Sequence, residues 1–164
     1  MRVLGIDPGT ISTGVGLVTL KDGKEYVEFA GTIYVERSLA MPVRLKEIYH
    51  HLKQIVEKYK PTVVAVETCF FHKDVQAAVK LGEARALALL VAAEAELEIV
   101  EYPPARIKQA ICGNGRASKE QMQYMVRQLL RLNKDPKKDA ADALAIALCH
   151  LYSAKLRSLI SSAR

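Results

Sequence analysis

Apolar positions along this chain alternate between short runs and helical repeats, an order typical of an α/β fold. Residues 2–7 form a short apolar run, which predicts a buried strand. Two runs rich in β-branched and aromatic residues follow at 13–20 and 25–36, and Asp22-Gly23 between them predicts a tight hairpin. The first part of the chain therefore predicts three antiparallel strands.

The middle of the chain predicts helices and strands in alternation. Apolar residues recur at helical spacing over 42–59, and Pro61 ends that helix. The run at 62–67 is apolar up to its final acid, which predicts a strand covered on both faces. A long Ala/Leu helix at 75–95 and a fifth strand at 97–102 complete this part.

The last third of the chain predicts helices without further strands. A short helix is expected at 104–111, and Ser118 with Gln121 forms a capping-box pattern that opens a helix to about Arg131. A final helix is expected at 139–156. This element order is that of a ribonuclease H-like fold, an α/β fold with a five-stranded mixed sheet and helices on both sides.

Composition narrows the class of protein. Half of the residues are apolar and no linker or repeat divides the chain, so we expect one globular domain over residues 1–164. Charged residues interrupt the longest apolar stretches, and the N-terminus lacks the segments of a signal peptide, so we expect a cytoplasmic protein without a membrane span. The odd, widely spaced Cys69, Cys112 and Cys149 are expected to be reduced thiols.

Charge is distributed unevenly along the chain. Residues 1–103 carry 12 basic and 14 acidic side chains, whereas residues 104–164 carry 12 basic and 4 acidic ones. A basic end of this kind favours a phosphate backbone as partner, although a solvated surface explains the charge equally well. The same two explanations apply to the cluster of Lys134, Lys137 and Lys138.

Carboxylates stand at the ends of apolar segments in three places. Asp7 and Glu67 end predicted strands, while Asp139 and Asp142 share one face in the first turn of the last helix. Taken singly, each has an ordinary explanation as a turn or cap residue. Together, convergent acids without Cys or His favour a site for a hard cation such as Mg²⁺. Two such ions roughly 3.5–4 Å apart would suit phosphodiester hydrolysis, with Asp7 between them.

Longer segments resemble the RuvC family of bacterial Holliday-junction resolvases, and the resemblance is collinear over nearly the full chain. The matching segments are LGIDPGTISTGVG at 4–16, RLKEIY at 44–49, VETCFFHKD at 66–74, KLGEARALA at 80–88, EYPPARIKQA at 101–110, GNGRASKEQMQYMVRQLL at 113–130 and DAADALAIALCH at 139–150.

The resemblance implies specific roles at matching positions. It implies that the catalytic and metal-binding acids are Asp7, Glu67, Asp139 and Asp142, of which Asp139 matches a position where some relatives carry His. Contacts to junction DNA are implied for Phe70, Lys108 and Lys119, and Phe70 would lie against unpaired bases. The basic residues Arg106 and Arg116 flank the same Gly-rich segment, which suits phosphate binding.

The resemblance also implies an assembly. It implies a homodimer that cuts four-way DNA junctions by paired symmetric nicks, uses Mg²⁺ with Mn²⁺ as a possible substitute, and cooperates with the branch-migration proteins RuvA and RuvB.

The helix at 75–95 would supply the dimer contact. One apolar stripe of that helix is expected to cover the sheet, namely Val75, Ala78, Val79, Gly82, Ala86, Leu89, Leu90 and Ala93. A second stripe would then meet the partner or, alternatively, the C-terminal helices, namely Ala77, Leu81, Ala84, Ala88, Val91 and Ala92.

Other functions remain open at this level. Residues 5–10 also resemble the phosphate loop of actin-like ATPases and sugar kinases, but those enzymes need two such domains and this chain is too short. A ribosomal-RNA-precursor nuclease on the same fold is a second alternative. A non-catalytic junction-binding module is a third, although a DNA binder would gain by losing clustered acids.

Overall fold

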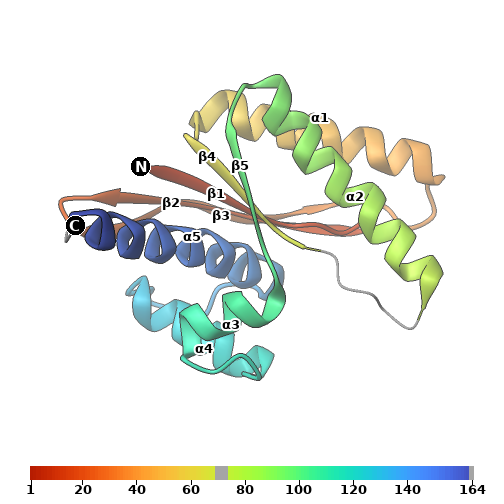
Figure 1. The fold of residues 1–164 in the computed structure, drawn as a ribbon. Helices are drawn as coiled ribbons and strands as arrows, with labels where there is room; N and C mark the ends of the chain where they lie inside the picture. The colour runs from red at the N-terminus through yellow and green to blue at the C-terminus, as the bar shows by residue number, and fades with distance from the viewer. Residues whose placement is uncertain (69–73, 163–164) are drawn as a thin grey trace.

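The computed structural model describes residues 1–68 and 74–162, and across them the chain forms a five-stranded mixed sheet and five helices. The strands are β1 (Arg2–Asp7), β2 (Ser12–Lys21), β3 (Lys24–Tyr34), β4 (Val63–Glu67) and β5 (Glu98–Tyr102). The helices are α1 (Met41–Tyr59), α2 (Val75–Glu94), α3 (Pro104–Cys112), α4 (Lys119–Leu129) and α5 (Lys138–Ser162). Helices α1 and α2 lie on one side of the sheet, while α3, α4 and α5 lie on the other (Figure 1). The predicted α/β class and element order are confirmed.

The sheet order is β3-β2-β1-β4-β5, with β1 antiparallel to β2 and parallel to β4. The predicted hairpin is confirmed, because Asp22 and Gly23 have φ angles of 52° and 75°, the two positive values that a type I′ turn requires. An irregularity in the β2–β3 register at Leu17/Val18 changes which β3 side chains face each layer. Val27 packs on the α5 side, whereas Phe29 packs on the α1 side.

Helix α5 is the centre of one core layer and lies directly on β1 and β2. A Cβ atom at Gly5 would collide with the backbone of Ala143, and one at Gly14 would collide with the carbonyl of Asp139. Two glycines therefore let the helix backbone approach the sheet closely. Residues 143–149 are buried on every side because α3 and α4 cover the outer face. By length and composition alone α5 would suffice for a membrane span, and half of its most apolar stretch is buried inside the protein.

Helix α2 turns a different face to the protein than its sequence pattern suggested. The buried positions are Ala84, Ala88, Val91 and Ala92, so the stripe expected to cover the sheet is the wrong one. In that stripe Val75 is 71% exposed, Val79 56% and Leu90 49%. The reason is that α2 packs mainly beside α1, where Tyr49 donates a hydrogen bond to Glu94, and less over the strands. An apolar stripe of α2 consequently faces outward.

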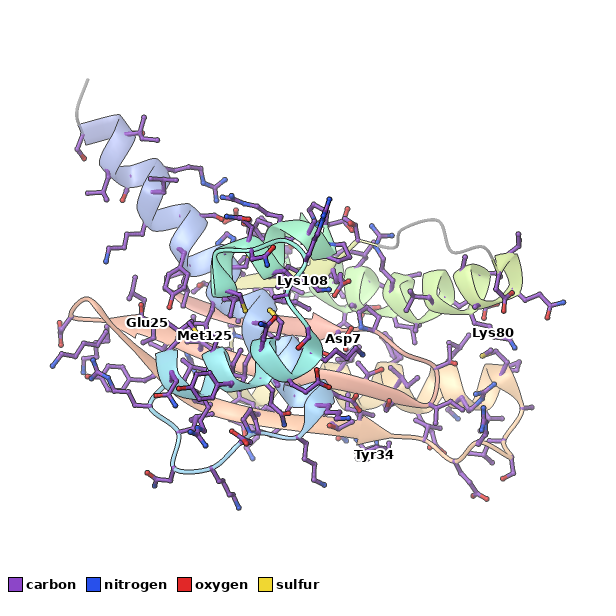
Figure 2. All side chains as sticks on the ribbon, turned by 90° about the horizontal axis from the view of Figure 1, so that it is seen from below. Asp7, Glu25, Tyr34, Lys80, Lys108 and Met125 are labelled. Carbon is purple, nitrogen blue, oxygen red and sulfur yellow. The ribbon has the colours of Figure 1, made fainter. Side chains whose placement is uncertain are left out.

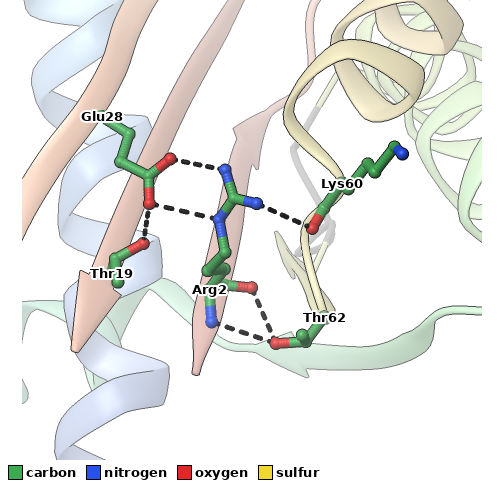
Figure 3. Close-up of polar contacts among 5 residues, drawn as sticks. All are labelled: Arg2, Thr19, Glu28, Lys60 and Thr62. Atoms are coloured by element: carbon green, nitrogen blue, oxygen red, sulfur yellow. Dashed lines mark hydrogen bonds and ion pairs between the residues drawn. The ribbon is translucent and has the colours of Figure 1, made fainter. Parts of the chain in front are cut away.

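A polar network ties the strands together at the end of the sheet opposite Asp7 (Figure 3). The Arg2 guanidinium on β1 donates to Glu28 on β3, with an Nη2–Oε2 distance of 2.5 Å, and Thr19 on β2 donates to the same carboxylate. Arg2 also donates to the Lys60 carbonyl, and its backbone N–H donates to the Thr62 hydroxyl over 3.0 Å. The network holds the first residue of β1 against its neighbouring strands, and Asp7 is the last residue of the same strand.

Candidate active site

Two acids stand side by side at the carboxyl end of the sheet. β1 and β4 are parallel neighbours with Ile6 opposite Val66, so the next residue of each strand, Asp7 and Glu67, leaves the sheet at the same edge. Both strands are buried up to that point, which makes the positions of the two carboxylates rigid. The predicted adjacency of the first and fourth strands is confirmed, and it follows the rule that functional groups gather at strand carboxyl ends.

Helix α5 brings the remaining acids to the same edge. Asp142 lines a cavity of about 250 Å³ together with Asp7 and Glu67. Asp139 does not line this cavity; its backbone carbonyl lies over Gly14, the residue that pairs with Asp7 across β1 and β2. The close approach of α5 to the glycines of the sheet therefore sets the position of both aspartates.

The carboxylates strongly influence one another. The pKa of Asp7 is raised from its ordinary 3.8 to about 7, chiefly by burial and then by the charges of Asp142, Glu67 and Asp139 in that order. Burial also raises the pKa of Glu67 and of Asp142, with Asp142 adding to the effect at Glu67. A desolvated cluster of negative charge is thus the main electrostatic feature of this cavity.

The donor set suits a hard divalent cation. All of the acids offer oxygen ligands, and a bound cation would relieve the repulsion that raises their pKa values. Across residues 1–68 and 74–162, no three His, Cys, Asp or Glu side chains have the spacing of a ready-made metal site. The acids are thus close enough to raise the pKa of Asp7 but are not drawn together to the spacing of metal ligands, as expected of carboxylates that repel each other.

Two of the four predicted basic residues reach this cavity. Lys108 on α3 and Lys119 on α4 line it. The positive charge of each partly offsets the rise in the pKa of Glu67 and of Asp142. Figure 2 shows Lys108 on the same side of the molecule as Asp7. Arg106 and Arg116 are exposed but do not line the cavity. Arg106 instead lies near Cys149 of α5.

The helix N-terminus beside the cavity is already partly satisfied. The predicted capping box is confirmed, since the Gln121 amide donates to the Ser118 hydroxyl and the Ser118 amide donates to the Gln121 side chain. These two amides are therefore not available to a phosphate, and the side chains of Lys108 and Lys119 remain the cationic groups of the cavity.

Apolar side chains that the sequence analysis did not single out form the rest of the cavity wall. They are Pro104, Ile107 and Met122. The sequence does carry a pattern that predicts buried positions for two of them. Ile107 with Ile111, and Met122 with Val126, are apolar pairs at i, i+4 spacing, and both pairs are buried. An apolar wall lowers the local dielectric and strengthens every charge interaction in the cavity.

Phe70, predicted to contact DNA, lies outside the described residues, as do Cys69 and His72. The two described cysteines, Cys112 and Cys149, are both free thiols.

Comparisons with known proteins converge on one family. The family model for crossover junction endodeoxyribonuclease RuvC matches residues 3–150. The chain is 43% identical over 163 residues to the crossover junction endodeoxyribonuclease RuvC of Syntrophomonas wolfei, which covers 99% of this chain and 95% of that protein. Among solved structures it resembles Thermus thermophilus RuvC, with a TM-score of 0.87, 34% identity, and coverage of 95% of this chain and 96% of that one. A structure of T. thermophilus RuvC in complex with a Holliday junction substrate matches with a TM-score of 0.86 and 32% identity, with the same coverage of both chains.

Proposed function

Because this chain belongs to the RuvC family of crossover junction endodeoxyribonucleases, we propose that its acidic cavity is the active site at which it resolves four-way (Holliday) DNA junctions. The chain is a junction resolvase, a hydrolase that cleaves DNA phosphodiester bonds in recombination. One observation carries the assignment of the site. Acids from β1, β4 and α5 and lysines from α3 and α4 meet in a single cavity at the carboxyl end of the sheet.

Nucleases of this family use a divalent cation, and we propose Mg²⁺, two ions per site, with Mn²⁺ able to substitute. Asp7, Glu67, Asp142 and Asp139 are the residues that would hold them. When bound, the ions would stabilise negative charge on the phosphate and make water a stronger nucleophile at neutral pH. Asp7 suits the shared ligand because its carboxylate interacts with all three of the other acids.

The other residues of the cavity position the DNA. Lys108 and Lys119 are set to hold the non-bridging oxygens of the scissile phosphate, since they are the cations that line the acidic cavity. Arg106 and Arg116, which lie outside the cavity, would contact phosphates farther along the arms. Phe70 lies three residues after Glu67 in sequence, and we propose that it stacks on unpaired bases at the crossover.

Resolution requires two nicks related by the approximate two-fold symmetry of the junction, and a C₂ homodimer supplies two sites with that symmetry. We propose that the dimer forms through the outward stripe of α2. Its members share one helix face at spacings of three and four residues and are Val75, Val79, Gly82, Ala86, Leu90 and Ala93. The same proposal includes cooperation with RuvA and RuvB, and a location in the cytoplasm with the chromosomal DNA.

The test is cleavage of a synthetic four-way junction with and without Mg²⁺, beside a linear duplex and a structured ribosomal-RNA precursor. We expect Mg²⁺-dependent, symmetric nicks near the crossover of the junction alone. Preferred cutting of the RNA would instead identify a precursor nuclease on the same fold. Junction binding without cleavage in either Mg²⁺ or Mn²⁺ would indicate a binding module and contradict the proposal.

A further inference from the structure

A second cavity, of about 790 Å³, lies on the α5 side of the sheet and is not part of the acidic site. Its walls come from the end of β3, from the connection between α4 and α5, and from the first turn of α5. We call it the β3 groove; its lining includes Thr32, Tyr34, Lys134, Asp135, Lys137 and Ala140.

The β3 groove is adjacent to the acids across the sheet. Asp7 on β1 pairs with Gly14 on β2, and Gly14 pairs with Thr32 on β3, so these residues form one row across three strands. Asp139 lies over the middle of that row, and the next residue, Ala140, lines the groove. With strands about 4.8 Å apart, the groove begins roughly 10 Å from Asp7. Figure 2 shows Tyr34 and Asp7 toward the same end of the sheet.

The polar groups of the β3 groove suit an anion. Lys137 places its Nζ 5.8 Å from the centre of the Tyr34 ring, a cation–π contact that holds the ammonium over the groove. Lys134 adds a second positive charge, while the carboxylate of Asp135 is paired with Arg127 at 3.3 Å. Among the described residues, the Thr32 hydroxyl is buried without a hydrogen-bond partner. The groove thus combines two cations, a hydroxyl without a hydrogen-bond partner and an exposed aromatic ring.

We propose that the β3 groove is a second DNA subsite, which holds backbone phosphates of the junction strand on the side of Asp139 away from Lys108 and Lys119. The inference rests on the proposed function, since it extends the path of the same strand. A distance of roughly 10 Å from Asp7 places the held phosphates within a few nucleotides of the scissile bond. A positive groove in continuity with the acids favours DNA over a peptide strand added to the edge of β3.

The test compares a double variant, Lys134→Gln/Lys137→Gln, with a matched control, Lys24→Gln/Lys58→Gln. In the control pair Lys58 likewise lies over a tyrosine ring, with its Nζ 5.0 Å from the centre of Tyr59, but α1 covers the other side of the sheet. All four lysines are exposed, so neither pair is expected to disturb folding. Junction binding is measured in Ca²⁺, to suppress cleavage, over a series of salt concentrations.

We expect the slope of log affinity against log salt to fall by about 2 in the groove variant, because each lost phosphate contact removes about one counterion. The control should keep the wild-type slope. Single methylphosphonates are then placed at each of the positions flanking the scissile bond. At one or two of these positions, neutralising the phosphate should weaken binding by wild type and leave the groove variant unaffected.

At subsaturating enzyme, cleavage by the groove variant should fall together with its binding, whereas the control variant should cleave at the wild-type rate. A groove variant with the wild-type salt slope and the wild-type methylphosphonate profile would overturn the subsite while leaving the proposed function in place. A wild-type protein that neither binds nor cuts the junction would overturn both.

Discussion

At the scale of single residues, the ionised carboxylate of Asp7 lowers the stability of the folded protein when no metal is bound. Its pKa of about 7 in the folded protein lies above its ordinary 3.8, so the folded state binds this proton more tightly than the unfolded state does. Without metal, the free energy of unfolding contributed by this group is fully present below pH 4 and falls as the pH rises toward 7. Asn at position 7 cannot ionise, so Asp7→Asn does not lose stability as the pH rises. At 1.36 kcal/mol per pKa unit, we expect its free energy of unfolding at pH 8 to exceed that of the wild type by roughly 2–4 kcal/mol.

Thermal melts in EDTA at pH 4 and pH 8 measure this gain. Asp7→Asn should melt well above the wild type at pH 8 and close to it at pH 4, and Mg²⁺ should stabilise the wild type more than the variant. Equal differences at the two pH values would show that Asp7 does not lie in a desolvated cluster of acids.

Residue positions in the site were predictable where a strand or helix end fixed them. Asp7 and Glu67 follow buried strands, so their convergence needed only the order of the strands. The direction of Lys108 and Arg106 was not predictable in the same way, because residues two apart on a helix point to nearly opposite sides. The buried Ile107 and Ile111 set the helix rotation, and only packing against α5 decides which lysines meet the acids.

At the scale of elements, the contact between α5 and the sheet sets the geometry of the acids. Gly14→Ala would place a Cβ against the Asp139 carbonyl and push α5 away from β2. We expect a loss of stability of about 1–3 kcal/mol. A disproportionate loss of cleavage should accompany it, since Asp139 and Asp142 move with the helix. Gly115→Ala is the comparison, because its Cβ would meet nothing nearer than the Ala105 carbonyl at 3.3 Å. Equal cleavage by the two variants would contradict this role of α5.

The proposed dimer face is the outward stripe of α2, and charged substitutions there test it. Val79→Glu or Ala86→Glu should give a folded monomer, because both side chains are exposed and both lie on the proposed dimer face. Ala84 and Ala88, at 2% and 1% exposure, are unsuitable, since a charge there would disrupt the fold itself. Ala77→Glu, exposed on the opposite side of the helix, is the control. Sedimentation should show monomers for the first two variants and dimers for the control; a dimeric Val79→Glu protein would place the interface elsewhere.

Elements with a local signal were predictable from sequence, and those that depend on partners were not. The hairpin at Asp22-Gly23 and the capping box at Ser118 are defined by a few neighbouring residues. Helix α2 is apolar most of the way round, so its rotation could not be read from its own sequence and was predicted wrongly. Helix α5 continues to Ser162, beyond the predicted end at 156, as an exposed extension that no buried periodicity marks.

At the scale of the whole molecule, the fold collects charge of both signs at one edge of the sheet. The acids come from three elements far apart in sequence, while the cations come from the basic final third of the chain. The excess of basic residues in the final third of the chain therefore lies partly near the acids. Lys108 on α3 and Lys119 on α4 line the acidic cavity, and Lys134 lies in the connection before α5. Figure 1 shows α3, α4 and α5 together on one side of the sheet. A DNA strand would meet attraction on both sides of a negative centre, which needs a cation before phosphate can approach.

The most direct measurement is the fate of a supercoiled plasmid that extrudes a cruciform, since paired nicks across the junction linearise it and single nicks only relax it. With Mg²⁺, wild type should give linear plasmid cut at the base of the cruciform. Asp7→Asn should bind the cruciform at least as tightly and leave the plasmid supercoiled, because it has lost a metal ligand and some repulsion toward phosphate. Linear product from Asp7→Asn at the wild-type rate, or an intact plasmid with wild type, would contradict the account.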